Sequence, residues 1–159
     1  MNKGLPEEIN GWKIYAHPCF QNVYNELVND VEALRAKDPE GYQKKAATKL
    51  LAVVHKVIEE GIAIDPTAQS YRQGATLGVS HKDWSRAKFG QGRYRLFFRY
   101  STREKIIVLA WMNDSETLRT YGSKTDSYKT FEKMLKKGRP PKDWEQLLQE
   151  AEKMKSDDQ

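Results

Sequence analysis

The residues best suited to chemistry in this 159-residue chain are arginines and lysines, which gather in the stretch 83–100. This stretch reads as two strand-like runs joined by Gly90-Gln91-Gly92, the pattern of a β-hairpin. Strand side chains alternate between faces, so an aromatic face lies opposite a cationic one. Guanidinium groups bind phosphate oxygens bidentately, and lysine adds a point charge, so the hairpin favours a polyanionic ligand. The cations are Arg86, Lys88, Arg93, Arg95 and Arg99.

Positive charge is concentrated in this hairpin region. The whole chain has a net charge of +5, whereas residues 81–105 hold eight basic and two acidic residues, a balance of +6. A localised patch indicates nucleic acid as the first candidate partner and an acidic protein as the second. A charged solvent face with ordinary cross-strand pairs is the alternative, but few acidic residues are interleaved to form such pairs.

Motifs for a metal or an activated nucleophile are missing from the sequence. The three histidines are far apart, Cys19 is the single cysteine, and no HExxH, CxxC or glycine-rich phosphate loop occurs. We therefore expect neither a metal site nor a cofactor. Two residues near the hairpin are candidate substrate contacts: His81, which could instead be an exposed loop residue, and Trp84, which could stack on an unpaired base.

A cationic surface can cleave RNA without a metal, because RNA carries its own nucleophile, the 2′-hydroxyl. Cleavage then needs in-line positioning, a proton acceptor, a proton donor and stabilisation of the charge on the pentavalent phosphorane. Arginine and lysine supply that stabilisation, and a perturbed tyrosine or lysine can move protons. Composition leaves three functions open: a metal-independent ribonuclease, a non-catalytic nucleic-acid-binding module, and an interaction protein that docks an acidic segment.

The elements that position the cations are expected to form one domain. Residues 1–11 should be a flexible lead-in, residues 12–150 the domain, and residues 151–159 a frayed polar tail. No apolar signal segment is visible, and the longest apolar run, 106–112, is too short to span a bilayer. We therefore expect a cytoplasmic protein.

Hydrophobic periodicity predicts two consecutive helices in the first half of the domain. A short strand at 12–15 precedes a helix at 18–37. Asp38 and Pro39 suit the start of a second helix, and Gly61 suits its end. A short joint between two amphipathic helices predicts an antiparallel helical hairpin.

The second half begins with the basic hairpin and an apolar strand at 105–113, followed by a helix capped by Thr125 or Asp126. Pro140-Pro141 would begin the last helix. Strands joined by short turns pair antiparallel, so we predict an α+β fold with a small antiparallel sheet packed against the helical hairpin. The aromatic face of residues 94–100 would meet the helices, and the arginine face would stay open to a ligand.

Four long segments resemble the YhaV family of bacterial type II toxins, which in turn resembles the RelE superfamily. The segments are GWKIYAHPCF at 11–20, KAATKLLAVVHKVIEE at 45–60, the hairpin at 83–101, and WMNDSETLRTYG at 111–122. The resemblance implies a RelE-like fold and a messenger RNA endoribonuclease that acts with or on the ribosome. It also implies a cognate AbrB-like antitoxin of the PrlF type, which blocks the toxin and binds operator DNA together with it.

The resemblance also implies roles for particular residues. The RelE pattern has a basic-x-basic pair on one strand, an arginine after a tyrosine on the next, and a later arginine shortly followed by a tyrosine. Arg86 and Lys88 match the pair, Arg95 matches the second element, and Arg119 and Tyr121 match the third. Arg93 and Arg99 would hold RNA at the margin of this site. The C-terminal helices could cover the site or carry the antitoxin.

Overall fold

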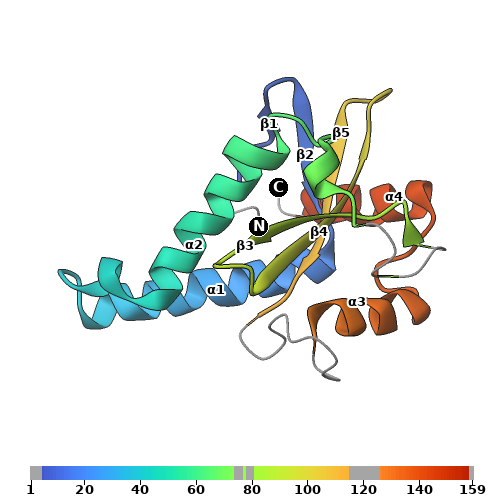
Figure 1. Cartoon of the computed structure of the whole chain (residues 1–159). Coiled ribbons are helices and arrows are strands. Elements are labelled where there is room, and N and C mark those ends of the chain that lie inside the picture. Colours follow the sequence, from blue (N-terminus) through green and yellow to red (C-terminus); the bar gives the residue numbers. More distant parts are fainter. Residues whose placement is uncertain (1–4, 74–76, 78–80, 115–125, 158–159) are drawn as a thin grey trace.

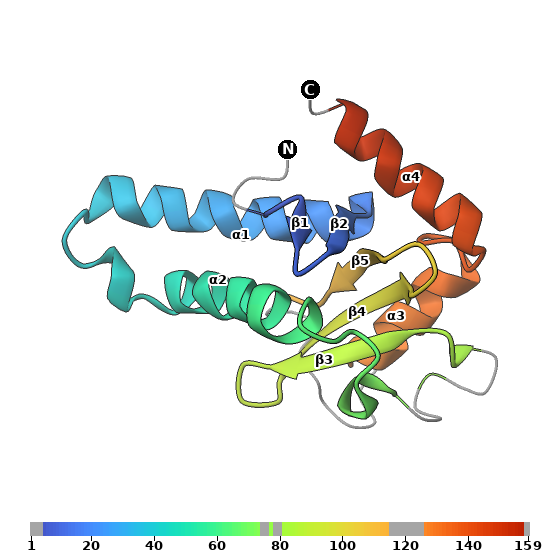
Figure 2. The same ribbon diagram turned by 90° about the horizontal axis from the view of Figure 1, so that it is seen from above.

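A five-stranded sheet separates two layers of helices in the computed structural model, which describes residues 5–73, 77, 81–114 and 126–157 (Figures 1 and 2). The spatial order of the strands is β1-β2-β5-β4-β3. No helix within these ranges is long and apolar enough to cross a membrane. The strands are β1 (Glu8–Ile9), β2 (Trp12–Ala16), β3 (Ser85–Phe89), β4 (Tyr94–Ser101) and β5 (Ile106–Met112).

The sheet is mixed, so the predicted α+β class is confirmed but the predicted antiparallel sheet is wrong at one pair. Strands β3, β4 and β5 form the expected antiparallel meander, whereas β2 runs parallel to β5. Parallel neighbours need a crossover connection between them. The helical hairpin that follows β2 carries the chain across one face of the sheet and returns it at β3 (Figure 2).

The first helix, α1 (Pro18–Lys37), has the predicted bounds, but the second helix starts later than predicted. Asp38 ends α1 and turns its side chain to the backbone N–H of Gly41, at 3.0 Å, instead of capping a new helix. A 3-10 turn follows, and then α2 (Ala46–Val57). The predicted stop at Gly61 falls within a π-helical turn (Ile58–Ile62) that continues α2.

The aromatic face of β4 packs against the helical hairpin, as predicted. Leu96 and Phe98 are fully buried there, with the partly buried Tyr94 and Tyr100 beside them. They meet side chains of both hairpin helices, among them Phe20 and Tyr24 of α1 and Val54 of α2. The period-2 alternation of β4 therefore places its apolar side chains correctly.

The opposite face of the sheet is covered by α3 (Ser127–Lys136) and α4 (Trp144–Asp157), so the predicted open arginine face is wrong. Asp126 caps α3 as predicted, through a bond from the Tyr128 N–H. The last helix starts at Trp144 and not at the two prolines, because Asp143 accepts the N–H of Gln146. Buried apolar residues of α3, α4 and the strands form the core of this layer: Phe97, Val108, Trp111, Phe131, Leu135 and Leu147.

The chain ends contribute more structure than a flexible lead-in and a frayed tail. Strand β1 pairs with β2 within the segment 1–11, and Leu5 is buried. Helix α4 continues through the buried Ala151 to Asp157. Residues 1–4 and 158–159 lie outside the described ranges.

Phe131 of α3 is the centre of an aromatic cluster that holds the C-terminal layer on the sheet. Its ring centroid lies 4.2 Å from that of Phe97, 5.2 Å from that of Trp84 and 5.7 Å from that of Trp111. We expect Phe131→Ala to lower the free energy of unfolding by about 3–5 kcal/mol, because a fully buried ring is lost and a cavity is left. Urea denaturation measures this change. The exposed Lys133→Ala in the same helix is the control and should stay within about 0.5 kcal/mol. A similar small loss for both variants would contradict the role of Phe131.

His17 joins the start of α1 to α4. Its Nδ1 atom accepts the N–H of Cys19 at 3.1 Å, so the ring proton resides on Nε2, which donates to Glu150 Oε1 at 2.8 Å. Burial lowers the pKa of His17 below its ordinary value of 6.5, although the Glu150 carboxylate acts in the opposite direction. A lowered pKa in the folded chain means that the unfolded chain binds the proton more tightly, so acid destabilises the fold through this group.

We expect the free energy of unfolding to fall between about pH 7 and pH 5, and His17→Asn to reduce that fall. Asparagine keeps a side-chain acceptor at the helix N-cap but does not titrate. Urea denaturation of both proteins at several pH values measures the difference. Parallel curves for the two proteins would show that His17 does not contribute to the pH dependence.

Candidate active site

Two of the predicted catalytic arginines converge on one hydroxyl group. The oxygen of Tyr128, in the first turn of α3, accepts hydrogen bonds from Arg86 Nε at 2.9 Å and from Arg95 Nε at 3.1 Å. The Arg95 guanidinium also lies 5.6 Å from the centre of the Tyr128 ring. Helix α3 therefore brings a phenol to the place where strands β3 and β4 present their cations.

Arg95 is fixed in position by its own hairpin and by Asn113. Its Nη1 atom donates to the carbonyl oxygens of Gly92 at 2.7 Å and Tyr94 at 3.0 Å, and the residue is only 3% exposed. The Asn113 side chain accepts the Arg95 N–H at 2.7 Å and donates to the Arg93 carbonyl oxygen at 3.2 Å. Asn113 thus continues the β4–β5 ladder beyond the end of β5.

A β-bulge in β5 sets which way the residues at the end of this strand face. The pairing with β4 shifts between Phe97 and Phe98, and Ala110 and Trp111 both belong to the C-terminal core layer although they are consecutive. Such a bulge adds one residue to a strand and rotates the residues after it. Met112 therefore faces the helical hairpin, and Asn113 comes to lie beside the backbone of Arg95.

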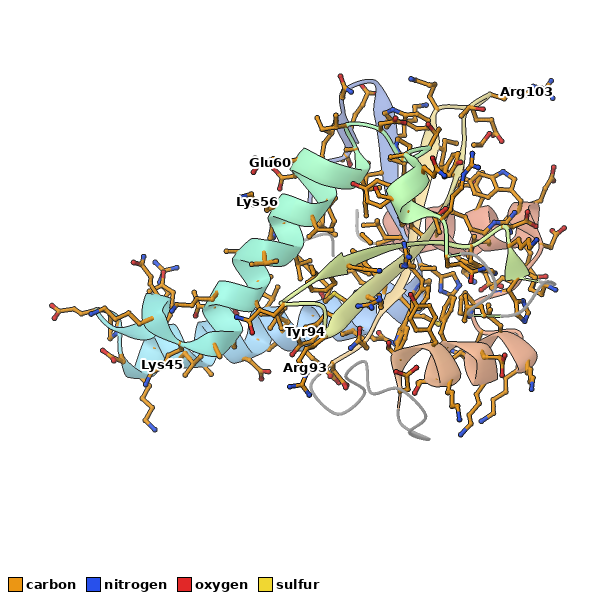
Figure 3. All side chains as sticks on the ribbon, viewed as in Figure 1. Lys45, Lys56, Glu60, Arg93, Tyr94 and Arg103 are labelled. Carbon is orange, nitrogen blue, oxygen red and sulfur yellow. The ribbon has the colours of Figure 1, made fainter. Side chains whose placement is uncertain are left out.

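Lys88 lies directly opposite Arg95 in the β3–β4 register and is exposed. Like charges opposite each other on a sheet repel, so this pair costs stability unless a counter-charge binds. Within the described ranges no acidic side chain forms a salt bridge with either residue. Arg93 is exposed and lies at the turn end of the same hairpin, next to Tyr94 (Figure 3).

Arg99 belongs to the same face but is held away from the arginine pair. Its guanidinium lies 5.5 Å from the ring centre of Trp84 and 5.6 Å from that of Trp144, and it donates to the carbonyl oxygen of Lys142. Burial lowers the pKa of Arg99, against the opposing effect of nearby carboxylates. Trp84 is 1% exposed beneath it. The prediction that Trp84 stacks on a base is therefore wrong, because its ring is part of the core.

The other predicted site residues are His81, Arg119 and Tyr121, and the described part of the structure does not show any of them beside Arg86 and Arg95. His81 is half-buried in the segment before β3, and burial followed by Lys142 lowers its pKa. The imidazole is therefore neutral near neutral pH, which weakens it as a cationic substrate contact. Arg119 and Tyr121 lie outside the described residues. Among the residues that are described, no group of three or more His, Cys, Asp or Glu side chains could hold a metal ion.

Sequence reasoning missed Tyr128 and Asn113. Tyr128 shares a helical face with Phe131 and Leu135, so its spacing indicates a core residue and not a partner of arginines. Asn113 follows an apolar strand as an ordinary terminating residue would. What the assembled site can do is bind a phosphate: two converging guanidinium groups and an exposed lysine face the same region, with neutral oxygen atoms holding them.

Comparison with known proteins agrees with this chemistry. Residues 14–152 match the Toxin_YhaV family, described as a toxin with endonuclease activity, of a toxin–antitoxin system. The chain belongs to the YhaV toxin family. The predicted family and the predicted enzyme class, a toxin endonuclease, are thereby confirmed.

Three curated relatives of the YhaV family match over 149 residues, which is 93% of this chain and 97% of each relative. Toxin YhaV of Escherichia coli O6:H1 strain CFT073 is 65% identical. Ribonuclease toxin YhaV of Escherichia coli K12 and Toxin YhaV of Escherichia coli O157:H7 are each 64% identical. No solved structure matches the chain, so the RelE-like likeness stays a prediction. A toxin–antitoxin family implies an antitoxin partner.

The Asn113 amide is open to a direct test. We expect Asn113→Ala to slow endonuclease cleavage about tenfold or more, because Arg95 loses the group that fixes its backbone. The buried N–H left behind should also cost about 1–3 kcal/mol of stability. Asn113→Asp keeps the acceptor and should retain more activity. Single-turnover cleavage of an end-labelled RNA measures both variants. A parental rate in Asn113→Ala would show that the Asn113 side chain is not needed for cleavage.

Proposed function

We propose that this chain is a toxin endoribonuclease that cleaves messenger RNA, with or on the ribosome, and thereby stops translation and growth. The observation that carries the proposal is the Arg86 and Arg95 pair, joined through one hydroxyl beside the exposed Lys88. The name of the Escherichia coli K12 relative, a ribonuclease toxin, supports RNA as the substrate class.

The proposed reaction uses the 2′-hydroxyl of RNA as nucleophile and no metal ion. The 2′-oxygen bonds to the adjacent phosphorus while its proton passes to a base. The 5′-oxygen of the next nucleotide then leaves and takes a proton from an acid. The products are a 2′,3′-cyclic phosphate and a free 5′-hydroxyl. Arg86 and Arg95 would stabilise the charge on the phosphorane, and Lys88 would hold an adjacent phosphate or take part in proton transfer.

The Tyr128 hydroxyl occupies the position between the two guanidinium groups that a phosphate oxygen would take. A bound phosphate would replace or share these hydrogen bonds, because both Nε atoms now donate to the phenol. Arg119 and Tyr121 keep the roles implied by the family resemblance: Arg119 would stabilise the phosphorane, and Tyr121 would orient the base or shuttle a proton.

The proposed partners are those of a toxin–antitoxin family with a cationic surface. The antitoxin would be AbrB-like, of the PrlF type, and would block the toxin and bind operator DNA together with it. Lys88 and Arg93 are exposed cations that an acidic antitoxin segment could cover. The toxin would act in the cytoplasm, where its substrate is.

One observation favours a second candidate function. Arg95 is only 3% exposed, so the pair as it stands offers Arg86 and Lys88 to a ligand more readily than Arg95. A non-catalytic module would bind RNA, or an antitoxin and its operator, through these outer cations alone. Its binding would weaken with salt, and no cleavage would accompany it.

The deciding experiment is cleavage of messenger RNA by the purified chain in a chelator, with and without ribosomes, followed by mapping of the RNA ends. We expect cyclic-phosphate ends, and a rate lowered on the order of 10²-fold or more by Arg86→Ala. Lys56→Ala, which removes an exposed cation of α2, is the matched control and should cleave normally (Figure 3).

Three other outcomes would each contradict one part of the proposed ribonuclease function. Intact RNA under all conditions would exclude the nuclease and leave the binding module. Cleavage abolished by the chelator would exclude the metal-independent reaction. Equal rates for Arg86→Ala and the parent would remove the arginine pair from the reaction.

A further inference from the structure

A polar pocket of about 500 Å³ lies at the far end of the β3–β4 hairpin from its turn. Figure 3 shows Arg93 and Arg103 at opposite ends of β4, and the pocket lies toward the Arg103 end. Three cations and one carboxylate contribute to its lining, so the pocket is positively charged. The lining includes Arg72, Lys82, Asp83, Ser85, Arg99 and Tyr100.

Hydrogen bonds, a backbone bridge and cation–π contacts hold several residues that line the pocket. The Arg99 guanidinium lies 5.5 Å and 5.6 Å from the ring centres of Trp84 and Trp144 and donates to a backbone carbonyl. Arg72 forms an isolated bridge with Ser85, the first residue of β3. Gln73 at the pocket accepts the N–H of Leu77 at 3.0 Å and donates to the carbonyl oxygen of His81 at 2.9 Å. Such preorganisation lowers the entropy cost of binding a ligand.

The charge in and around this pocket is not cancelled. Asp83 lines it, and Asp143 lies near enough to raise the pKa of Arg99. Against these carboxylates stand Arg72, Lys82 and Arg99, and beside His81 the positive charges of Lys142 and Lys136 outnumber the single negative charge of Glu132. Within the described ranges neither Arg72 nor Lys82 forms a salt bridge. A phosphate would provide the missing counter-charge.

The pocket lies near the arginine pair along strands β3 and β4. Ser85 precedes Arg86 directly in β3, and Arg86 Nη1 donates at 2.6 Å to the carbonyl oxygen of Ser70, two residues before Arg72. Along β4 the step from Arg95 to Arg99 is four residues, or about 13 Å. Strand β3 is the last in the sheet order, and residues 70–72 lie beside its Ser85–Arg86 end, so a ligand would pass over this segment from one cluster to the other.

We propose that this pocket is a second phosphate subsite, which holds the backbone of the same RNA strand at most about four nucleotides from the scissile phosphate. The inference rests on the proposed ribonuclease function and extends it to substrate length. RNA fits the spacing better than a separate anion would, because the two cationic clusters follow one another along the β3–β4 strand pair. The half-buried Tyr100 ring at the pocket offers a surface for an adjacent base.

The test compares the double variant R72A/K82A with K45A/K56A, which removes two exposed cations from the helical-hairpin layer (Figure 3). Both are assayed on one RNA shortened nucleotide by nucleotide from each end. We expect R72A/K82A to raise KM about tenfold for long RNA, to leave kcat unchanged, and to reduce the salt slope of binding by about two. Once the RNA is too short to reach the pocket, the double variant and the parent should have equal kcat/KM.

Several results would overturn the subsite. An unchanged KM in R72A/K82A would overturn it. The same defect at every RNA length would also overturn it, because it would indicate a change of the whole fold and not the loss of one subsite. Lost antitoxin binding with normal RNA kinetics would make the pocket a protein-docking site. Tight binding of a nucleoside monophosphate alone, followed by NMR, would make it a free-nucleotide site. If the parent cleaves no RNA at all, the proposed function fails. Binding of intact RNA then still tests the pocket through its salt slope.

Discussion

The site depends on two buried or half-buried guanidinium groups that are satisfied by neutral oxygen atoms. Burying a charge is costly unless its donors find acceptors. Arg86 and Arg95 share the Tyr128 hydroxyl, and Arg95 also donates to two carbonyl oxygens of its own hairpin. A carboxylate would have satisfied the same donors and cancelled their charge. Neutral acceptors keep the positive charge available, as the proposed stabilisation of a phosphorane would require.

This arrangement requires both helical layers. The helical hairpin fixes the register of β4 by burying Leu96 and Phe98, and that register turns Arg95 and Phe97 to the other side. The C-terminal layer then supplies Tyr128, whose ring lies 5.4 Å from that of Phe97. The bulge in β5 places the Asn113 side chain beside the backbone of Arg95, where it accepts the Arg95 N–H. One cationic site therefore depends on packing on both faces of the sheet.

The sequence predicts the parts of this structure that depend on strict alternation or on a strong cap. The two faces of β4, the bounds of α1 and the Asp126 cap are all readable in this way. The continuous apolar run at 106–112 carries no periodicity, so it shows neither the parallel pairing with β2 nor the bulge. The charge of Arg99 predicts an exposed side chain, but its guanidinium makes cation–π contacts with two indole rings. Tyr128 has the spacing of a core residue because its ring packs in the core, but its hydroxyl bonds to the arginines.

The exposure of the cations sets the order in which RNA would meet them in the proposed reaction. Lys88 is exposed on the edge strand, Arg86 is half-buried beside it, and Arg95 lies innermost on the next strand. RNA would therefore contact Lys88 first and Arg95 last, after the Tyr128 hydroxyl has given up a hydrogen bond to Arg86 or Arg95. Phe131, one turn further along α3, is fully buried among aromatic rings and anchors the helix. Rearrangement at the first turn of α3 would thus complete the site without loss of the core beneath it.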